Sequence, residues 1–228
     1  MTGQSLKLAR LKRRWTQQRA ARYLRVSQGY LSLMEKGHRP VTRTLLKRLL
    51  KAYEVPPTAL PLLSEGSWAS ADAEAFARCL GALGYPGFSH LKSRPHRNPA
   101  EVLLQALMQS SLDSRVAAGL PWLPFAYPDM DWDWLVRNAK LNDIQNRLGF
   151  AVSLARQLAE REHEDPKAAV LRQQEFRLER SRLVREDTFC HGELTEAEKR
   201  WLRERRPPEA ARWNLLTDLT VERLANVI

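Results

Sequence analysis

Hydrophobic residues recur at helical spacing along almost the whole chain, whereas the alternation that marks β-strands is hard to find. Over the first 60 residues this pattern predicts short helices near 5–13, 17–24, 28–35 and 42–53. Pro56-Pro57 then closes this segment, because a proline cannot continue a helix. The pattern therefore predicts an all-α fold that begins with a small helical domain.

The rest of the chain carries its own helix signals, mostly capping residues and prolines. Helix starts are expected at Ser70 with Asp72, Asn98-Pro99, Asp113, Asp131, Asn142, Pro166 and the capping-box pattern from Thr195 to Glu198. The helix from Asn142 is expected to reach about Glu162, and the helix from Pro166 about Glu186. We therefore divide the chain into a helical domain over 1–60, a linker over 61–70 and a larger helical domain over 71–228.

Residues 16–37 pair two short amphipathic helices across a tight turn. Ala20, Ala21 and Leu24 give the first helix an apolar face with small residues, so that the second helix can cross closely. Leu31 and Met34 give the second helix a narrow buried edge. Its opposite side is short and mostly polar, and consists of Ser27, Gln28, Gly29, Ser32, Leu33 and Lys36. Such a surface fits the major groove of DNA, which is about 12 Å wide and admits one helix.

These residues and further positions at fixed spacing match a family pattern: residues 6–55 resemble a DNA-binding domain of the Cro/CI (XRE) helix-turn-helix repressor family. The matching positions are Leu6, Ala9, Arg10, Thr16, Gln17, Ala21, Leu24, Val26, Ser27, Gln28, Ser32, Glu35, Gly37, Pro40, Leu46, Leu49 and Tyr53. The resemblance covers about a fifth of the chain. It implies a lambda-repressor-like domain that binds double-stranded operator DNA.

The resemblance also implies which residues read the bases. Gln28 would be the main reader, since a Gln amide can bond adenine N6 and N7 together. Gly29, Ser32 and Leu33 would fill the other groove-facing positions, and Gln17 would reach a phosphate while it supports Gln28. The expected phosphate contacts of the following loop and helix start are Lys36, His38, Arg39 and Arg43.

Other positions have structural roles in this comparison, and two depart from the family pattern. Thr16 would cap a helix, and an ion pair between Arg10 and Glu35 would tie the first helix to the third. Arg25 stands where the family usually has glycine, so that it must accept a positive φ at some cost. Leu33 can touch a thymine methyl group but cannot read a hydrogen-bond pattern. We therefore expect modest base discrimination from one monomer and binding as a homodimer.

The charge distribution supports a polyanionic partner for the first domain. Residues 1–60 hold 14 Lys and Arg but only two acids, Glu35 and Glu54, for a net charge of +12. The remaining 168 residues have a net charge of −1. A basic module on a neutral body favours nucleic acid or an anionic membrane as a partner, and the resemblance selects nucleic acid.

Signals for other chemistry are thin. Cys79 and Cys190 are too few for a disulfide framework or a metal quartet, which fits a cytoplasmic protein. No apolar run approaches the roughly 18 residues of a membrane helix, and no secretory signal follows the basic N-terminus. Cys190-His191 lacks further ligands at zinc spacing. We expect no catalytic residue, metal site, cofactor or membrane contact, and no enzyme.

Two apolar segments of the second domain leave alternatives open. Trp122, Phe125, Tyr127, Trp132 and Trp134 indicate a core, with a bound apolar ligand as the alternative. The stretch over 212–228 fits either packing within the domain or docking to a partner.

The block over 98–160 is similar to C-terminal regions of helix-turn-helix antitoxins that pair with nucleotidyltransferase-like (AbiEii/MenT-type) toxins. This likeness favours a transcriptional repressor that is also an autoregulatory antitoxin, whose second domain binds and neutralises a cognate toxin. The alternative is a stand-alone transcription regulator with a ligand-sensing or dimerising helical domain. A third hypothesis is a basic adaptor that binds nucleic acid without sequence preference.

Overall fold

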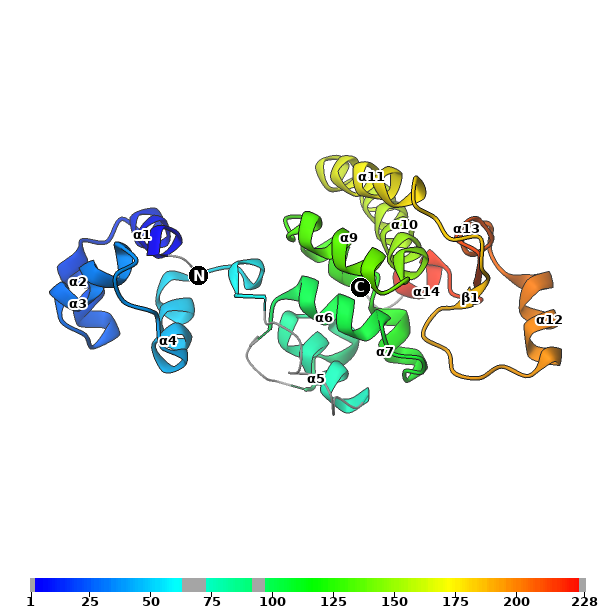
Figure 1. Ribbon diagram of the computed structural model, residues 1–228, viewed down its shortest axis with the longest axis horizontal. Helices are drawn as coiled ribbons and strands as arrows, with labels where there is room; N and C mark the ends of the chain where they lie inside the picture. Colours follow the sequence, from blue (N-terminus) through cyan, green and yellow to red (C-terminus); the bar gives the residue numbers. More distant parts are fainter. Residues whose placement is uncertain (1–2, 63–72, 92–96, 226–228) are drawn as a thin grey trace. The chain divides into compact units, whose positions relative to one another are not determined.

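The computed structural model describes residues 3–62, 73–91 and 97–225, and helices dominate these parts of the chain (Figure 1). The all-α prediction is confirmed. The chain divides into two compact units, residues 1–61 and 62–228, each with a hydrophobic core of its own. Apart from residues 61–62, the predicted linker over 61–70 lies outside the described residues, as does the helix start predicted at Ser70 and Asp72.

The helices of the first unit are α1 (Gly3–Lys12), α2 (Gln17–Leu24), α3 (Gln28–Glu35) and α4 (Arg43–Tyr53), followed by the short 3-10 helix η1 (Pro57–Ala59). The bounds of α1 to α4 lie within two residues of those predicted from the hydrophobic pattern. All four helices contribute to one core, whose fully buried members include Leu6, Leu24, Leu31, Met34 and Leu49. The apolar faces predicted for α2 and α3 are therefore confirmed.

Local hydrogen bonds define where these helices begin and end. The hydroxyls of Thr16, Ser27 and Thr42 each accept a hydrogen bond from the backbone N–H three residues further on. These bonds satisfy N–H groups that a helix start leaves unpaired, and they confirm the capping role predicted for Thr16. Arg25 ends α2 with a φ of 58°, so the predicted positive φ of a non-glycine residue is confirmed. Gly37 follows α3 with a φ of 79°, which costs a glycine little.

The second unit contains α5 (Ala73–Leu83), η2 (Pro86–Phe88), α6 (Pro99–Leu107), α7 (Ser114–Gly119), α8 (Trp122–Ala126), α9 (Trp132–Leu141), α10 (Gln145–Arg161), α11 (Asp165–Glu179), α12 (Glu196–Arg205), α13 (Pro208–Arg212) and α14 (Val221–Ala225). Two short strands, β1 (Asp187–Thr188) and β2 (Leu215–Leu216), pair in parallel. α10 is buried along most of its length and packs against α6, α8, α9, α11, α13 and α14. It is the central helix of this unit.

The aromatic segment belongs to the core of the second unit, as predicted. Trp122, Phe125 and Trp132 are buried, and Tyr127 and Trp134 pack against the same core. The C-terminal stretch also packs within this unit up to residue 225, with buried Trp213, Leu215, Leu216, Leu219 and Leu224. The described part of this stretch therefore packs within its own domain, which was one of the two alternatives.

Several predicted helix caps of this unit are confirmed. The side chains of Asn98, Asp113 and Asp131 each accept a hydrogen bond from a backbone N–H of the following helix. Thr195 and Glu198 form the complete capping box at the start of α12. These caps depend on residues that are neighbours in the sequence, which is why the sequence predicts them.

The predicted start of α10 at Asn142 is wrong. Asn142 instead ends α9, and its N–H donates to the Asn138 carbonyl oxygen. Asp143 then turns the chain with a φ of 55°, and α10 begins at Gln145. A polar residue between two helices can end the first or cap the second, and the spacing of apolar residues does not distinguish these two roles.

The predicted end of α11 near Glu186 is also wrong, since the helix ends at Glu179. The Asn146 side chain of α10 donates to the Leu183 carbonyl oxygen at 2.9 Å and accepts from the Leu183 N–H at 2.8 Å. The Gln145 amide donates to the Ser181 carbonyl oxygen at 3.2 Å. These bonds take the backbone groups that a longer helix would need, and the chain leaves the helix toward β1.

Candidate nucleic-acid interface

α3 presents a short exposed surface on a fixed frame. Leu31 and Met34 are buried in the core of the first unit, which orients the helix. Gln28, Gly29 and Lys36 are exposed, as is Ser27 at the cap. Leu33 keeps 41% of its surface exposed, whereas Ser32 is half-buried. The side chains predicted to face the groove therefore lie together on the side of α3 that faces away from the core.

A buried ion pair holds the C-terminal end of α3. The Arg10 guanidinium donates two hydrogen bonds to the Glu35 carboxylate, at 2.6 and 3.0 Å, and a third to the Trp15 carbonyl oxygen at 2.7 Å. Burial opposes ionisation of Glu35, but hydrogen bonds from Arg10 and Gln17, together with the positive charges of Arg10 and Lys7, outweigh it and lower the pKa of this carboxyl. The predicted pairing of Arg10 with Glu35 is confirmed, and it joins α1 to α3.

Gln17, predicted to reach a phosphate and support Gln28, has a partner inside the unit. Its side-chain nitrogen donates to Glu35 at 2.9 Å. The structure thus brings Gln17 to the ion pair rather than to Gln28. The N-terminal end of α2 is thereby tied to the same carboxylate that ties α1 to α3.

The first unit has a large excess of positive charge, and both of its acidic residues are paired with arginine. Glu54 accepts hydrogen bonds from Arg13 at 2.6 and 2.8 Å, and Glu35 is taken by Arg10. The exposed cations in the described residues of this unit include Lys7, Lys12, Arg14, Arg19, Arg22, Arg25, Lys36, Arg39, Arg48 and Lys51. These cations create a positive electrostatic potential that attracts a polyanion such as DNA. Binding of the cations to phosphates would release the counterions of the DNA.

The predicted phosphate contacts lie in the segment between α3 and α4 and at the first residue of α4. Lys36, His38 and Arg39 are exposed there, directly after the end of α3. Arg43 is the first residue of α4, and its side chain lies outside the described part of the structure.

An aromatic cluster beside α2 was not found from the sequence. The Trp15 ring lies 5.0 Å from Tyr23 and 5.9 Å from Tyr53, between ring centroids. The guanidinium groups of Arg13 and Arg19 lie 5.8 and 5.3 Å from the Trp15 ring. Burial raises the pKa of Tyr53 to about 12, so its hydroxyl stays neutral. A tryptophan directly before the cap Thr16 was the available signal, and it did not reveal which partners the ring would meet.

The second unit shows little that resembles a reaction centre. No group of three or more His, Cys, Asp or Glu that could hold a metal ion occurs among the described residues. Burial raises the pKa of Cys190 to about 12, and its thiol donates to the Ala106 carbonyl oxygen. No helix within the described ranges is both long and apolar enough to cross a membrane.

These features define the first unit as a DNA-binding helix-turn-helix domain, with α2 and α3 as the two helices of the motif. Residues 6–60 match the family model HTH_3, described as Helix-turn-helix, which is of the Cro/CI (XRE) type. The match covers about a quarter of the chain. It supports a DNA-binding transcription regulator as the class of this protein. Comparisons with curated proteins and with solved structures found no match.

Proposed function

We propose that the chain is a sequence-specific, cytoplasmic transcriptional repressor that binds operator DNA through α3. The observation that carries this proposal is the exposed face of α3 on a unit with a net charge of +12, both of whose acids are paired with arginine. Gln28 would read a base edge in the major groove, and Gly29, Ser32 and Leu33 would lie against neighbouring bases. Gln17, Ser27, Lys36, His38, Arg39 and Arg43 would complete the interface.

We further propose that the repressor binds as a homodimer. One helix-turn-helix domain reads only a half-site. In each copy Leu33 also occupies a groove-facing position at which a polar side chain could have formed hydrogen bonds with a base. Two copies would place their recognition helices about 34 Å apart, one turn of the duplex. The expected operator is accordingly a near-palindrome with half-sites spaced by one turn.

Binding measurements test this proposal. The full chain is titrated with the DNA upstream of its own reading frame and with a scrambled duplex of equal length, at several salt concentrations. A specific complex of two chains per operator, tighter than that on scrambled DNA, supports the proposal. Equal affinity for both duplexes with a steep salt dependence would instead identify a basic adaptor without sequence preference.

The finer proposal for the second unit is that it binds and neutralises a toxin, which would make the protein an autoregulatory antitoxin. Its support is the similarity of residues 98–160 to the C-terminal regions of helix-turn-helix antitoxins. The part of that similarity on α10 is buried, with Leu148, Phe150, Leu154 and Leu158 in the core. These residues would therefore maintain the fold of the second unit, and surface residues elsewhere on it would contact the toxin.

Co-expression tests the antitoxin proposal without dissecting the chain. A neighbouring reading frame that is toxic alone is expressed with the full chain and with the Gln28→Ala variant. We expect both proteins to restore growth and to co-purify with the toxin, because Gln28 lies on the DNA-binding unit. A protein that represses its promoter but rescues no neighbouring toxin would be a stand-alone regulator.

A further inference from the structure

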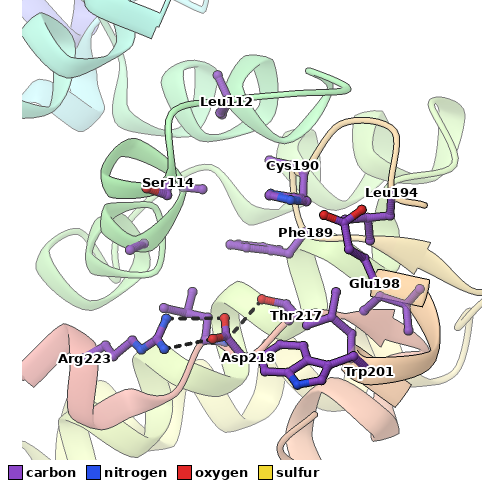
Figure 2. Close-up of a pocket in the computed structure, with 16 residues that line it drawn as sticks. Leu112, Ser114, Phe189, Cys190, Leu194, Glu198, Trp201, Thr217, Asp218 and Arg223 are labelled. Carbon is purple, nitrogen blue, oxygen red and sulfur yellow. Dashed lines mark hydrogen bonds and ion pairs between the residues drawn. The ribbon is translucent and has the colours of Figure 1, made fainter. Parts of the chain in front are cut away.

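The second unit has a pocket of about 280 Å³ between α7, the segment over 189–194, α12 and the chain that enters α14 (Figure 2). Its apolar walls are formed by Leu112, Ala117, Ala118, Phe189, Leu202 and Leu219 among others. Small-molecule sites typically combine such walls with a few polar groups, at volumes of about 300–1,000 Å³. The volume of this pocket lies just below that range, which limits a ligand to one or two rings.

The floor of the pocket is part of the core. Phe189 is 4% exposed and packs edge-on against Phe150 of α10, with ring centroids 5.0 Å apart. Leu216 of β2 and Leu219 are also buried. A floor supported by the central helix keeps its shape without a ligand, which limits the entropy that binding costs.

The outer wall is α12, which Figure 1 shows at the edge of this unit. Glu198, Trp201 and Leu202 stand three and four residues apart, so they share one side of the helix. Leu202 is buried, whereas Trp201 keeps 47% of its surface exposed. Arg205 of the same helix lies 5.2 Å from the Trp201 ring. A large indole thus lines the pocket with part of its surface uncovered.

The charged groups of the pocket favour a positively charged ligand. Arg223 already donates to both carboxylate oxygens of Asp218, at 2.8 and 3.3 Å, so an anion would have to displace Asp218 (Figure 2). Glu198 uses one oxygen, Oε2, to accept from the Thr195 N–H and hydroxyl at 2.7 and 2.8 Å. No partner of the other oxygen, Oε1, occurs among the described contacts.

We propose that this pocket binds a small organic cation, namely a protonated amine carried by an aromatic or similarly flat apolar body. The body lies between Phe189 and the α7 wall. The ammonium group donates to Glu198 Oε1, on the side of α12 that also carries Trp201. Because Asp218 is paired with Arg223, Glu198 is the carboxylate of the lining that faces such a ligand.

Three ligands with one ring system separate charge from shape. Tryptamine, indole-3-propionamide and indole-3-propionate carry a cationic, a neutral and an anionic group on similar side chains. Calorimetric titration of the full chain should give saturable binding of tryptamine with one site per chain. We expect the amide to bind more weakly and the carboxylate most weakly, because Arg223 is already occupied.

Matched variants locate the cation. Glu198→Gln keeps the capping box, which accepts Gln as well as Glu, and should lower the tryptamine affinity about two- to fivefold, as expected for an exposed ion pair. The amide affinity should not change. Glu196→Gln is the control, since this carboxylate of α12 pairs with Lys199 and does not line the pocket.

A second pair of variants tests the indole wall. Trp201→Ala should weaken all three ligands, whereas Phe176→Ala should not, because Phe176 is a 62% exposed aromatic residue of α11 outside this pocket. Circular dichroism establishes that each variant is folded. Absence of saturable binding, tightest binding of indole-3-propionate, or equal effects of Glu198→Gln and Glu196→Gln would overturn the proposal. DNA titrations are independent of these results, so the proposed repressor role is judged separately.

Discussion

α3 and α10 each contain a glycine, the second residue of α3 and the fifth residue of α10, and the two glycines meet opposite surroundings. A Cβ atom added at Gly29 of α3 would have no heavy atom within 4 Å. A Cβ atom added at Gly149 of α10 would lie 2.2 Å from the Trp213 ring. The first helix keeps one face free for another molecule, and the second is enclosed by its own unit. A glycine in a helix therefore does not show by itself whether the helix is exposed or enclosed, because this depends on which residues pack around it.

The two helices are alike in how an arginine secures them. Arg10 binds Glu35 at the end of α3, and Arg147 near the start of α10 binds Asp187 at 2.7 and 2.9 Å. Arg147 also donates to the carbonyl oxygens of Leu107 and Gln109. Each arginine joins segments far apart in the sequence. The Arg10–Glu35 pair holds α3 by its C-terminal end and leaves the residues at its N-terminal end exposed. Arg147 instead lies near the N-terminal end of a helix that is buried along most of its length.

The largest effect is expected for Glu35→Ala. It leaves the Arg10 guanidinium buried without its carboxylate, which should destabilise the first unit by about 3–5 kcal/mol. Urea unfolding, with hydrogen exchange followed separately in α3 and α10, should show the loss in α3. Glu54→Ala is the control, because its exposed pair with Arg13 should contribute at most about 1 kcal/mol. Equal losses for the two variants would contradict the role assigned to Glu35.

The glycine comparison can be tested directly. Gly149→Ala forces a methyl group into the Trp213 ring and should destabilise the second unit by about 1–3 kcal/mol, as overpacking does. Gly29→Ala should leave the first unit as stable or slightly more stable, since alanine favours helix over glycine by at most about 1 kcal/mol at this second helical position. Thermal unfolding of both variants is the measurement. A Gly149→Ala variant as stable as the parent chain would refute the close approach.

A comparable effect on binding is expected for Gln28→Ala. Loss of a two-bond contact with adenine should weaken binding to the operator by about 1–3 kcal/mol and flatten the base preference at one position per half-site. Binding to scrambled DNA should change little. Gln18→Ala, an exposed glutamine of α2, serves as the control. Equal losses on operator and scrambled DNA for Gln28→Ala would remove Gln28 from the base-reading role.

A smaller effect is expected for Arg39→Ala, and it should not depend on sequence. Loss of one phosphate contact should lower the salt slope of DNA binding by about 0.9 units, for operator and scrambled DNA alike. Arg180→Ala is the control, because this exposed arginine belongs to the second unit, whose net charge is −1. An unchanged slope for Arg39→Ala would place Arg39 outside the interface.

The smallest effect is expected from acidification below about pH 4, the range in which carboxyl groups take up protons. The pKa of Glu35 is lowered in the folded state, although burial opposes the hydrogen bonds that lower it. A carboxyl with a lowered folded-state pKa stabilises the fold above its unfolded pKa of about 4.3, and this stability is lost as the pH falls through the folded value. Glu35→Gln should remove this pH dependence in α3. The pKa of Asp187 is also lowered, so α10 should keep its own dependence in that variant.

The sequence predicted most of the first unit because its signals are local. Thr16 and the narrow apolar edge of α3 act within one or two helical turns, so spacing along the chain is enough to find α2 and α3. The Arg10–Glu35 pair was found through the family resemblance, since its partners are 25 residues apart. The hydrogen bond from Gln17 to Glu35 was not predicted. The Gln17 amide could have met Gln28 or Glu35, and the choice depends on how α1, α2 and α3 pack.

The helical class, the helix-turn-helix segment, the uneven distribution of charge and the caps at Asn98, Asp113, Asp131 and Thr195 follow from the amino-acid sequence alone. The start of α10, the end of α11 and the contact of Trp213 with Gly149 instead depend on how the helices pack. Caps and amphipathic faces depend on neighbours a few residues away, which a sequence displays. The end of α11 depends on Asn146, 37 residues before Leu183, and such a contact exists only after the chain has packed.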